Sequence, residues 1–309
     1  MQNAVPKYIF WIAGSALLLL LCLLLSLAIG EMPIWPWQWW GTDPGSMEKT
    51  ILSQLRLPRS LTALCIGGML SMSGSILQGL FKNPLVEPYT LGISGGASLG
   101  VALAFLMGIA QQWGSLGIGG FAFIGAIAIS LILLAYHRHR PGTNNLLLAG
   151  IMLSILCSAA TTLLLSLSTP ENMTQIIYWT MGSLSHSTPA QALSLCGFAI
   201  AGLCAGVLLS QRLNLMNLGE QTARHLGVNT AVLVPCLLLL TSLLTAVCVA
   251  TAGIIGFVGL VVPHILRRLA GSDYRLLVPL SFIGGGIFLV LCDLLARSLV
   301  HPGQLPVGV

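Results

Sequence analysis

Charged residues are scarce in this sequence. They make up 7% of its 309 residues, and 56% of the residues are hydrophobic, whereas roughly 25% of the residues of an ordinary soluble domain are charged. So few charges cannot cover the surface of a soluble domain of this length, so we predict an integral membrane protein. The net charge of +5 rests on few, scattered residues. This distribution forms no basic patch and argues against nucleic-acid binding.

The motifs of metal and nucleotide chemistry are missing. The eight cysteines are spread through apolar runs, with no CxxC pair and no histidine at metal-ligand spacing, so we predict no metal site. No GxxxxGK(S/T) phosphate loop occurs, so we do not expect the chain to hydrolyse a nucleotide or to be an enzyme. The richest glycine stretch, GISGGASLG, has a glycine at every fourth position (Gly92, Gly96 and Gly100). This spacing predicts close packing between membrane helices.

Apolar runs dominate the chain instead. A helix needs about 20 apolar residues to cross a bilayer, and we place spans near 8–30, 60–81, 92–109, 117–136, 146–168, 190–210, 229–250, 253–267 and 278–297. The first run is too long for the apolar part of a signal peptide and lacks a convincing cleavage site. The predicted fold class is therefore all-α, a polytopic membrane protein with about nine transmembrane helices in a single domain, 1–309.

The sequence stops at GQLPVGV, where a proline and apolar residues begin another helical pattern. We therefore expect that the chain is cut short of a tenth span.

Lysine and arginine are unevenly distributed between the two sides of this bundle. One side holds nine of the thirteen, contributed by Lys7, Lys82 and the segments 137–145, 211–227 and 267–275. By the positive-inside rule this side is the cytoplasm, and the N-terminus lies there too.

The opposite side receives fewer cations and a cluster of aromatic residues. Its cations are Lys49, Arg56, Arg59 and Arg297, and its tryptophans are Trp35, Trp37, Trp39 and Trp40. We interpret the tryptophan cluster as an interfacial anchor and, as the second alternative, as a recognition surface.

Ionisable residues within the spans are nearly absent. The clear case is Asp293, four residues before Arg297, which is the favoured order for an ion pair along one helix. We therefore predict a structural pair rather than a proton relay. A channel for cations or a transporter driven by an ion gradient would be expected to have more acids or histidines at membrane depth.

The RLPR stretch, residues 56–59, places two arginines near the start of a predicted helix. Pro58 suits the first position of a helix and should hold Leu57 extended, so that Arg56 precedes the helix and Arg59 lies in its first turn. Arginine there opposes the helix dipole, and no carboxylate is suitably spaced nearby. Lipid phosphates or an acidic partner protein would satisfy these charges, and the residues alone do not decide between them.

The PGTNN stretch, residues 141–145, precedes a strong apolar run. Thr143 and Asn144 are therefore predicted N-cap residues of the fifth span. The functional alternative is a polar constriction at the cytoplasmic mouth of a pore.

The stretch NLMNLGEQTARHLG, residues 214–227, interrupts the apolar pattern between two spans. Gly219 should divide it into two short helical pieces, and Gly227 can end the second with a left-handed residue. Glu220 and Arg224 are spaced as an ion pair along one helix face. The leucines among them predict that the segment lies on a surface, either the membrane interface or another protein, and the scarcity of basic residues favours a protein.

Six stretches, from RLPR near residue 56 to LPVGV at the end, together resemble the permease subunits of type II ATP-binding-cassette importers. The other four are LFKNPLVEPYTLGISGGASLG, NNLLLAG, NLGEQTARHLG and GFVGLVVPHILRRLAG. This family imports ferric siderophores, haem and vitamin B12. The resemblance implies ten helices per subunit, a homodimer or a pair with a close paralogue, two cytoplasmic ATPase subunits that bind ATP and Mg, and a periplasmic binding protein. It also implies the bacterial inner membrane.

The resemblance also assigns roles to residues. It implies that Arg56, Arg59 and Arg297 receive carboxylates of the binding protein and that Thr143 and Asn144 form a cytoplasmic gate. It implies that 214–227 are coupling helices resting in a groove of the ATPase. The expected contact core is Leu218, Gly219, Glu220, Ala223, Arg224 and Leu226.

The expected function is ATP-driven import of a bulky metal chelate, first of all a ferric siderophore. Vitamin B12, haem and an oxyanion such as molybdate are rival cargoes. A secondary transporter driven by an ion gradient and a membrane protein with a purely structural role are the rival classes.

Overall fold

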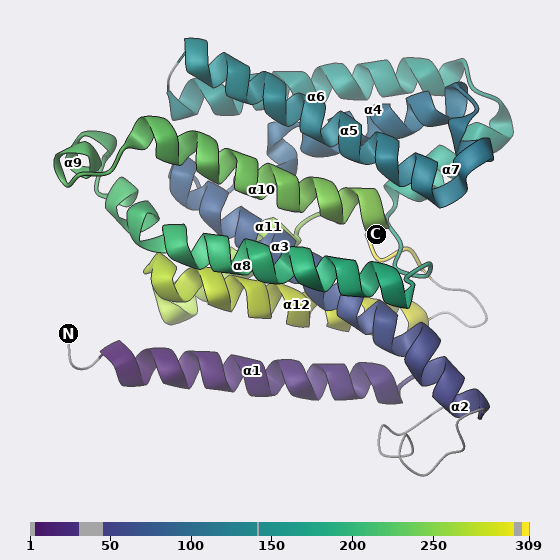
Figure 1. Cartoon of the computed structure of the whole chain (residues 1–309), viewed down its shortest axis with the longest axis horizontal. Helices are drawn as coiled ribbons and strands as arrows, with labels where there is room; N and C mark the ends of the chain where they lie inside the picture. The colour runs from purple at the N-terminus through teal and green to yellow at the C-terminus, as the bar shows by residue number, and fades with distance from the viewer. Residues whose placement is uncertain (1–3, 31–45, 141, 300–304, 309) are drawn as a thin grey trace.

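The computed structural model describes residues 4–30, 46–140, 142–299 and 305–308, and in these residues all regular structure is helical (Figure 1). The tryptophan cluster of residues 35–40 lies outside the described residues, so its predicted role as an anchor stays a prediction. The helices form one bundle, with α9 near one end and α2 at the other.

Each of the nine expected spans corresponds to a helix. These are α1 (Ala4–Ala28), α3 (Leu57–Phe81), α4 (Ile93–Leu106), α5 (Ile109–His139), α6 (Thr143–Ser166), α8 (Pro189–Asn217), α10 (Thr230–Ala252), α11 (Val258–Ala270) and α12 (Tyr274–Ser298). Shorter elements join them, namely α2 (Met47–Thr50), η2 (Ile51–Arg56), η3 (Pro88–Leu91), α7 (Pro170–Thr180) and α9 (Glu220–His225).

Two of the nine helices are shorter than expected. Seven helices of the described part are long and apolar enough to cross a membrane, whereas α4 has 14 residues and α11 has 13. The expected span at 253–267 begins only at Val258, because Gly253 and Phe257 have positive φ angles of 74° and 65° and hold the intervening backbone out of the helix. At about 1.5 Å per residue, α11 reaches about 20 Å, less than a bilayer core.

Helix α3 is the centre of the bundle, and it packs against α8, α10, α11 and α12. Glycines make the closest of these contacts. A Cβ atom on Gly67 would lie 2.2 Å from the Gly285 carbonyl oxygen of α12, and one on Gly74 would lie 1.9 Å from the Gly259 oxygen of α11. No larger residue fits at either crossing, and the backbones pack directly, as is typical of membrane helices.

The glycine stretch at 92–100 packs as predicted. A Cβ atom on Gly96 would lie 2.5 Å from the Gly125 carbonyl oxygen, and one on Gly100 would lie 2.1 Å from the Phe121 oxygen. Both oxygens belong to α5. The small residues of α4 therefore let α5 approach closely, and α6 covers another part of α4.

The predicted start of the second span at Pro58 was wrong. Leu57 is helical, with φ −62° and ψ −49°, and α2, η2 and α3 form one continuous helical segment from Met47 to Phe81. A widened π-helical turn, η2, directly precedes α3. Pro58 lacks the N–H that an α-helix would use, and such turns accommodate a missing bond within a helix.

The helix before the 214–227 segment also differs from the prediction. Residues 214–217 are no separate piece but the last turn of α8, which runs on to Asn217. The physical reason is packing, because Leu213 and Met216 are buried and keep this last part of α8 against the bundle. Gly219, at φ 120°, ends that helical path, and only α9 is a separate short helix.

Segments predicted to share the cytoplasmic side do lie together. The Tyr8 hydroxyl of α1 donates to Asp273, and Asn214 Nδ2 donates to Asp273 Oδ1 at 2.6 Å. The Asn214 side chain also accepts from the Tyr274 backbone N–H at 2.9 Å. These bonds join the start of α1, the end of α8 and the start of α12 at the end of the bundle where α9 lies (Figure 1).

Candidate docking cluster and coupling segment

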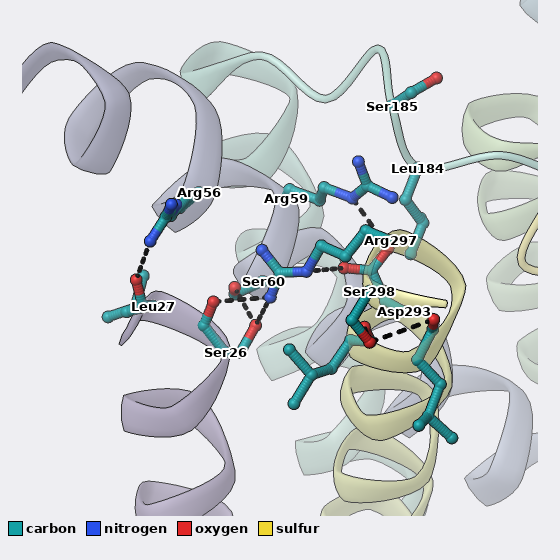
Figure 2. Close-up of polar contacts among 12 residues, drawn as sticks. Ser26, Leu27, Arg56, Arg59, Ser60, Leu184, Ser185, Asp293, Arg297 and Ser298 are labelled. Atoms are coloured by element: carbon teal, nitrogen blue, oxygen red, sulfur yellow. Dashed lines mark hydrogen bonds and ion pairs between the residues drawn. The ribbon is translucent and has the colours of Figure 1, made fainter. Parts of the chain in front are cut away.

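Arg56 lies in η2 and turns inward rather than preceding the helix. It is 7% exposed, and its Nη1 donates to the Leu27 and Ala28 carbonyl oxygens at 2.8 and 3.1 Å (Figure 2). These carbonyls belong to the last turn of α1, where they have no partner within the helix and the helix dipole is negative. Arg56 therefore caps the C-terminal end of α1.

Asp293 joins the other two arginines of the predicted docking set. It is 0% exposed, and its Oδ1 accepts from Arg59 Nε at 2.8 Å. Its Oδ2 lies 3.6 Å from Arg297 Nε, an ion pair too long to be a hydrogen bond. The predicted pair of Asp293 with Arg297 is confirmed. The sequence offered no partner for Arg59 because Asp293 is 234 residues away along the chain.

Arg297 extends this network to α1. Its Nη2 donates to the carbonyl oxygen and to the Oγ of Ser26, both at 2.6 Å. The Ser26 and Ser60 hydroxyl oxygens are 2.7 Å apart. Figure 2 shows Arg59 and Arg297 at Asp293, where α12 ends and α3 begins, and Arg56 turned from the same region toward Leu27 at the end of α1. We call Arg56, Arg59, Asp293 and Arg297 the arginine cluster, which has an excess of positive charge.

Thr143 and Asn144 are not capping residues. Thr143 is the first residue of α6, and the N-cap position is held by Gly142, at φ 143° and without a side-chain hydrogen bond. The N-cap prediction was therefore wrong by one position, since the positive φ at residue 142 suits glycine alone. Thr143 is half-buried and Asn144 is exposed, both at the end of the bundle that carries α9.

The coupling segment, residues 218–226, contains the ion pair predicted from its spacing. Arg224 Nη2 lies 2.7 Å from Glu220 Oε1, and Arg224 Nε donates to Thr230 Oγ1 at 2.8 Å. Thr230 in turn donates to Glu220 at 3.3 Å. A six-residue helix is unstable alone, so these bonds to the first residue of α10 fix its position.

The apolar side chains of the coupling segment divide into two groups. Ala223 is fully buried against the bundle, whereas Leu218 and Leu226 are 64% and 56% exposed. Gly227 ends the segment with a φ of 84°, the left-handed conformation that was predicted. Ala223 therefore packs the segment against the bundle, whereas Leu218 and Leu226 face away from it. These two exposed leucines are suited to contact with another surface.

A bundle of membrane-spanning helices, with a polar cluster at one end and a short helix with exposed leucines at the other, defines a polytopic membrane protein, the class to which transport permeases belong. The comparisons with known proteins agree. The chain belongs to the FecCD transport family, whose model matches residues 18–309.

Curated relatives match nearly the whole chain. A vitamin B12 import system permease protein, BtuC, of Klebsiella pneumoniae is 41% identical and covers 97% of this chain and 88% of the relative. The protein of the same name from Salmonella typhi is 40% identical, over 97% of this chain and 90% of the relative.

Two solved structures have related folds. A transporter described as of the metal-chelate ABC type, in an inward-facing conformation, superposes with a TM-score of 0.87 at 33% identity, covering 96% of this chain and 93% of its own. PsaBC from Streptococcus pneumoniae, solved with a Fab, has a TM-score of 0.52 at 17% identity over 82% of this chain and 85% of its own, and shows the fold alone. The chain is therefore a multi-pass permease subunit of a bacterial ABC importer and not an enzyme.

Proposed function

We propose that this permease imports vitamin B12. The observation that carries the proposal is the identity of 40–41% with permeases named for vitamin B12 import, spread over 97% of the chain. This reverses the order expected from the sequence, in which a ferric siderophore came first and vitamin B12 second.

A metal chelate such as a ferric siderophore is the second candidate cargo. It is supported by the solved transporter of metal-chelate type, which is less similar to this chain, at 33% identity.

Uptake into vesicles separates the two cargoes. Proteoliposomes would contain the permease with its ATPase subunits and would be supplied with the matching binding protein and either labelled cyanocobalamin or a labelled ferric hydroxamate. We expect ATP-dependent accumulation of cyanocobalamin at least tenfold above that of the ferric chelate. The reverse ratio would replace vitamin B12 with the siderophore.

We also propose that the arginine cluster is the docking point of a periplasmic binding protein. Three arginines and one carboxylate meet at one end of the bundle, so the cluster attracts acidic side chains. Arg59 is the outermost of the pair on Asp293, with its side chain 11% exposed against 8% for Arg297. A docking carboxylate would therefore meet Arg59 first.

The coupling segment is proposed to contact a cytoplasmic ATPase subunit. The exposed Leu218 and Leu226 supply apolar area, and the bonds from Glu220 and Arg224 to Thr230 connect α9 to α10. A short helix seated in a groove of the motor would then pass its movement to α10 as a rigid body.

The remaining assignments rest on family membership. We propose two copies of this chain, or one copy and a close paralogue, around a central path with Thr143 and Asn144 at its cytoplasmic gate. The N-terminus is proposed to lie in the cytoplasm, supported by the Tyr8–Asp273 bond that keeps the start of α1 at the end carrying the coupling segment.

A further inference from the structure

A groove of about 540 Å³ lies beside the coupling segment, between the C-terminal end of α5 and the first turns of α6 and α10. This volume is within the range of small-molecule sites, roughly 300–1,000 Å³. Thr143, Glu220 and Arg224 line part of it, but the gate and coupling roles given to these residues assign no ligand to the groove.

The groove is polar at one end and apolar at the other. Arg138, near the end of α5, and Thr230, the first residue of α10, line its outer part. Leu134, Val234 and Leu239 also line it. At about 1.5 Å per residue, Leu239 lies roughly 13 Å further along α10 than Thr230. The lining therefore changes from charged to apolar with depth along the helices.

The apolar part faces a surface suited to lipid. Leu131 and Ile132 on α5 are 55% and 49% exposed, and Val232 and Leu239 on α10 are 55% and 46% exposed. Helix α10 packs against both α5 and α8, and Figure 1 shows the three on one face of the bundle. Among the described residues nothing covers these side chains, and they lie on helices that span the membrane.

The polar part of the groove carries an excess of positive charge. Glu220 is the one acid in the lining, and it is already paired with Arg224. Arg138 is exposed and has no hydrogen bond or ion pair with any other described residue. The Nδ1 atom of His137 is buried and lacks a hydrogen-bond partner within the described part of the chain. An anion with oxygen acceptors would satisfy both groups.

We propose that this groove binds an anionic phospholipid, with the phosphate at His137 and Arg138 and an acyl chain along Leu134, Val234 and Leu239. The charge gradient along the groove matches that of a lipid at the membrane interface, and basic pockets between membrane helices are known to hold anionic headgroups. The headgroup would lie against the Glu220–Arg224–Thr230 bonds. Lipid binding would therefore stabilise the position of the coupling segment, and this effect does not depend on the cargo of the transporter.

Native mass spectrometry of the full chain in detergent, titrated with dioleoyl phosphatidylglycerol or dioleoyl phosphatidylcholine, tests the site. We expect tighter binding of phosphatidylglycerol. Arg138→Gln should weaken it about fivefold, since one basic residue contributes a factor of this size. Arg140→Gln is the matched control, because Arg140 is also an exposed cation, lies two residues away and does not line the groove, and it should change binding less than twofold.

A second pair of variants tests the apolar part. Ala231 lines the groove and is exposed, so Ala231→Trp should fill it and abolish the tight binding, whereas Val232→Trp, which adds the same ring outside the lining, should not. Equal losses for Arg138→Gln and Arg140→Gln, or equal binding of both lipids, would overturn the proposal. Retained lipid binding with lost ATPase association in Arg138→Gln would instead assign the groove to the partner protein.

Discussion

At the scale of single residues, Asp293 joins α3 and α12 at the end of the bundle opposite α9. Its carboxylate faces Arg59 and Arg297, which are themselves mostly buried. Removing one partner of a buried ion pair costs about 3–5 kcal/mol, because the remaining charge has neither solvent nor a counter-ion. Sequence spacing predicted only the Arg297 half of this arrangement, since the Arg59 half depends on the packing of α3 against α12.

Asp293→Asn is therefore expected to lower the thermal unfolding temperature of the detergent-solubilised protein clearly. Glu171→Gln removes an exposed acid in the first turn of α7 and serves as the control, with an expected change below about 1 kcal/mol. Equal melting of wild type and Asp293→Asn would contradict the structural role given to this carboxylate.

Substitutions of Arg59, also at the scale of single residues, test the proposed docking of the binding protein. Arg59→Gln should weaken the affinity of the binding protein about tenfold, which corresponds to roughly 1.4 kcal/mol, and should reduce the salt dependence of association. Arg59→Lys keeps the charge and should recover most of the affinity. Lys49→Gln, a cation of α2 at the same end, is the control in the same surface-binding measurement. Equal effects of Arg59→Gln and Lys49→Gln would remove Arg59 from the docking surface.

At the scale of elements, the coupling segment combines a fixed side and an exposed side. Leu218→Asp places a charge on the exposed side and should reduce co-purification of the ATPase at least tenfold. Met173→Asp makes the same change on α7, away from the coupling segment, at a side chain that is 43% exposed, and should leave co-purification unchanged. Normal assembly and uptake of the Leu218 variant would contradict the assignment.

Glu220→Arg acts on the ion pair within α9, because it replaces the partner of Arg224 with a like charge. The exposed pair contributes only about 0.3–0.5 kcal/mol, so the chain should still insert and fold. We expect ATP hydrolysis to continue while uptake falls, measured together in the same vesicles.

The junction of α1, α8 and α12 predicts a dependence on pH. Partial burial alone would raise the pKa of Asp273, but hydrogen bonds from Tyr8, Asn214 and the Arg275 N–H outweigh it and lower the pKa below its usual value. A lowered carboxyl pKa contributes stability above the unfolded pKa of about 3.9, and this contribution is lost as the pH falls through the folded value.

Thermal unfolding of wild type and Asp273→Asn between pH 3 and pH 6 tests the predicted contribution of the Asp273 carboxylate to stability. The stability advantage of wild type over Asp273→Asn should be constant above about pH 5 and shrink as the pH falls below about 3.9. Glu48→Gln, an exposed acid of α2, should show no such trend. A difference between wild type and Asp273→Asn that does not change with pH would show that the carboxylate charge has no part in the junction.

At the scale of the whole molecule, hydrophobic runs and the positive-inside rule were enough to predict the helices and which segments share an end. They failed where the backbone leaves the regular helix. The short α11 depends on Gly253 and Phe257 with positive φ, and the π turn before Pro58 depends on a missing N–H. Neither leaves a periodic signal. The arginine cluster and the bonds from α9 to Thr230 join distant segments, so only the folded chain reveals them.

We conclude that this chain is the membrane-spanning part of an ABC importer. The most direct test is uptake of labelled cyanocobalamin into proteoliposomes that contain the permease, its ATPase and the binding protein, with and without ATP and with a protonophore. We predict uptake that requires ATP and is unaffected by the protonophore. Uptake that continues without ATP and stops when the proton gradient collapses would contradict it.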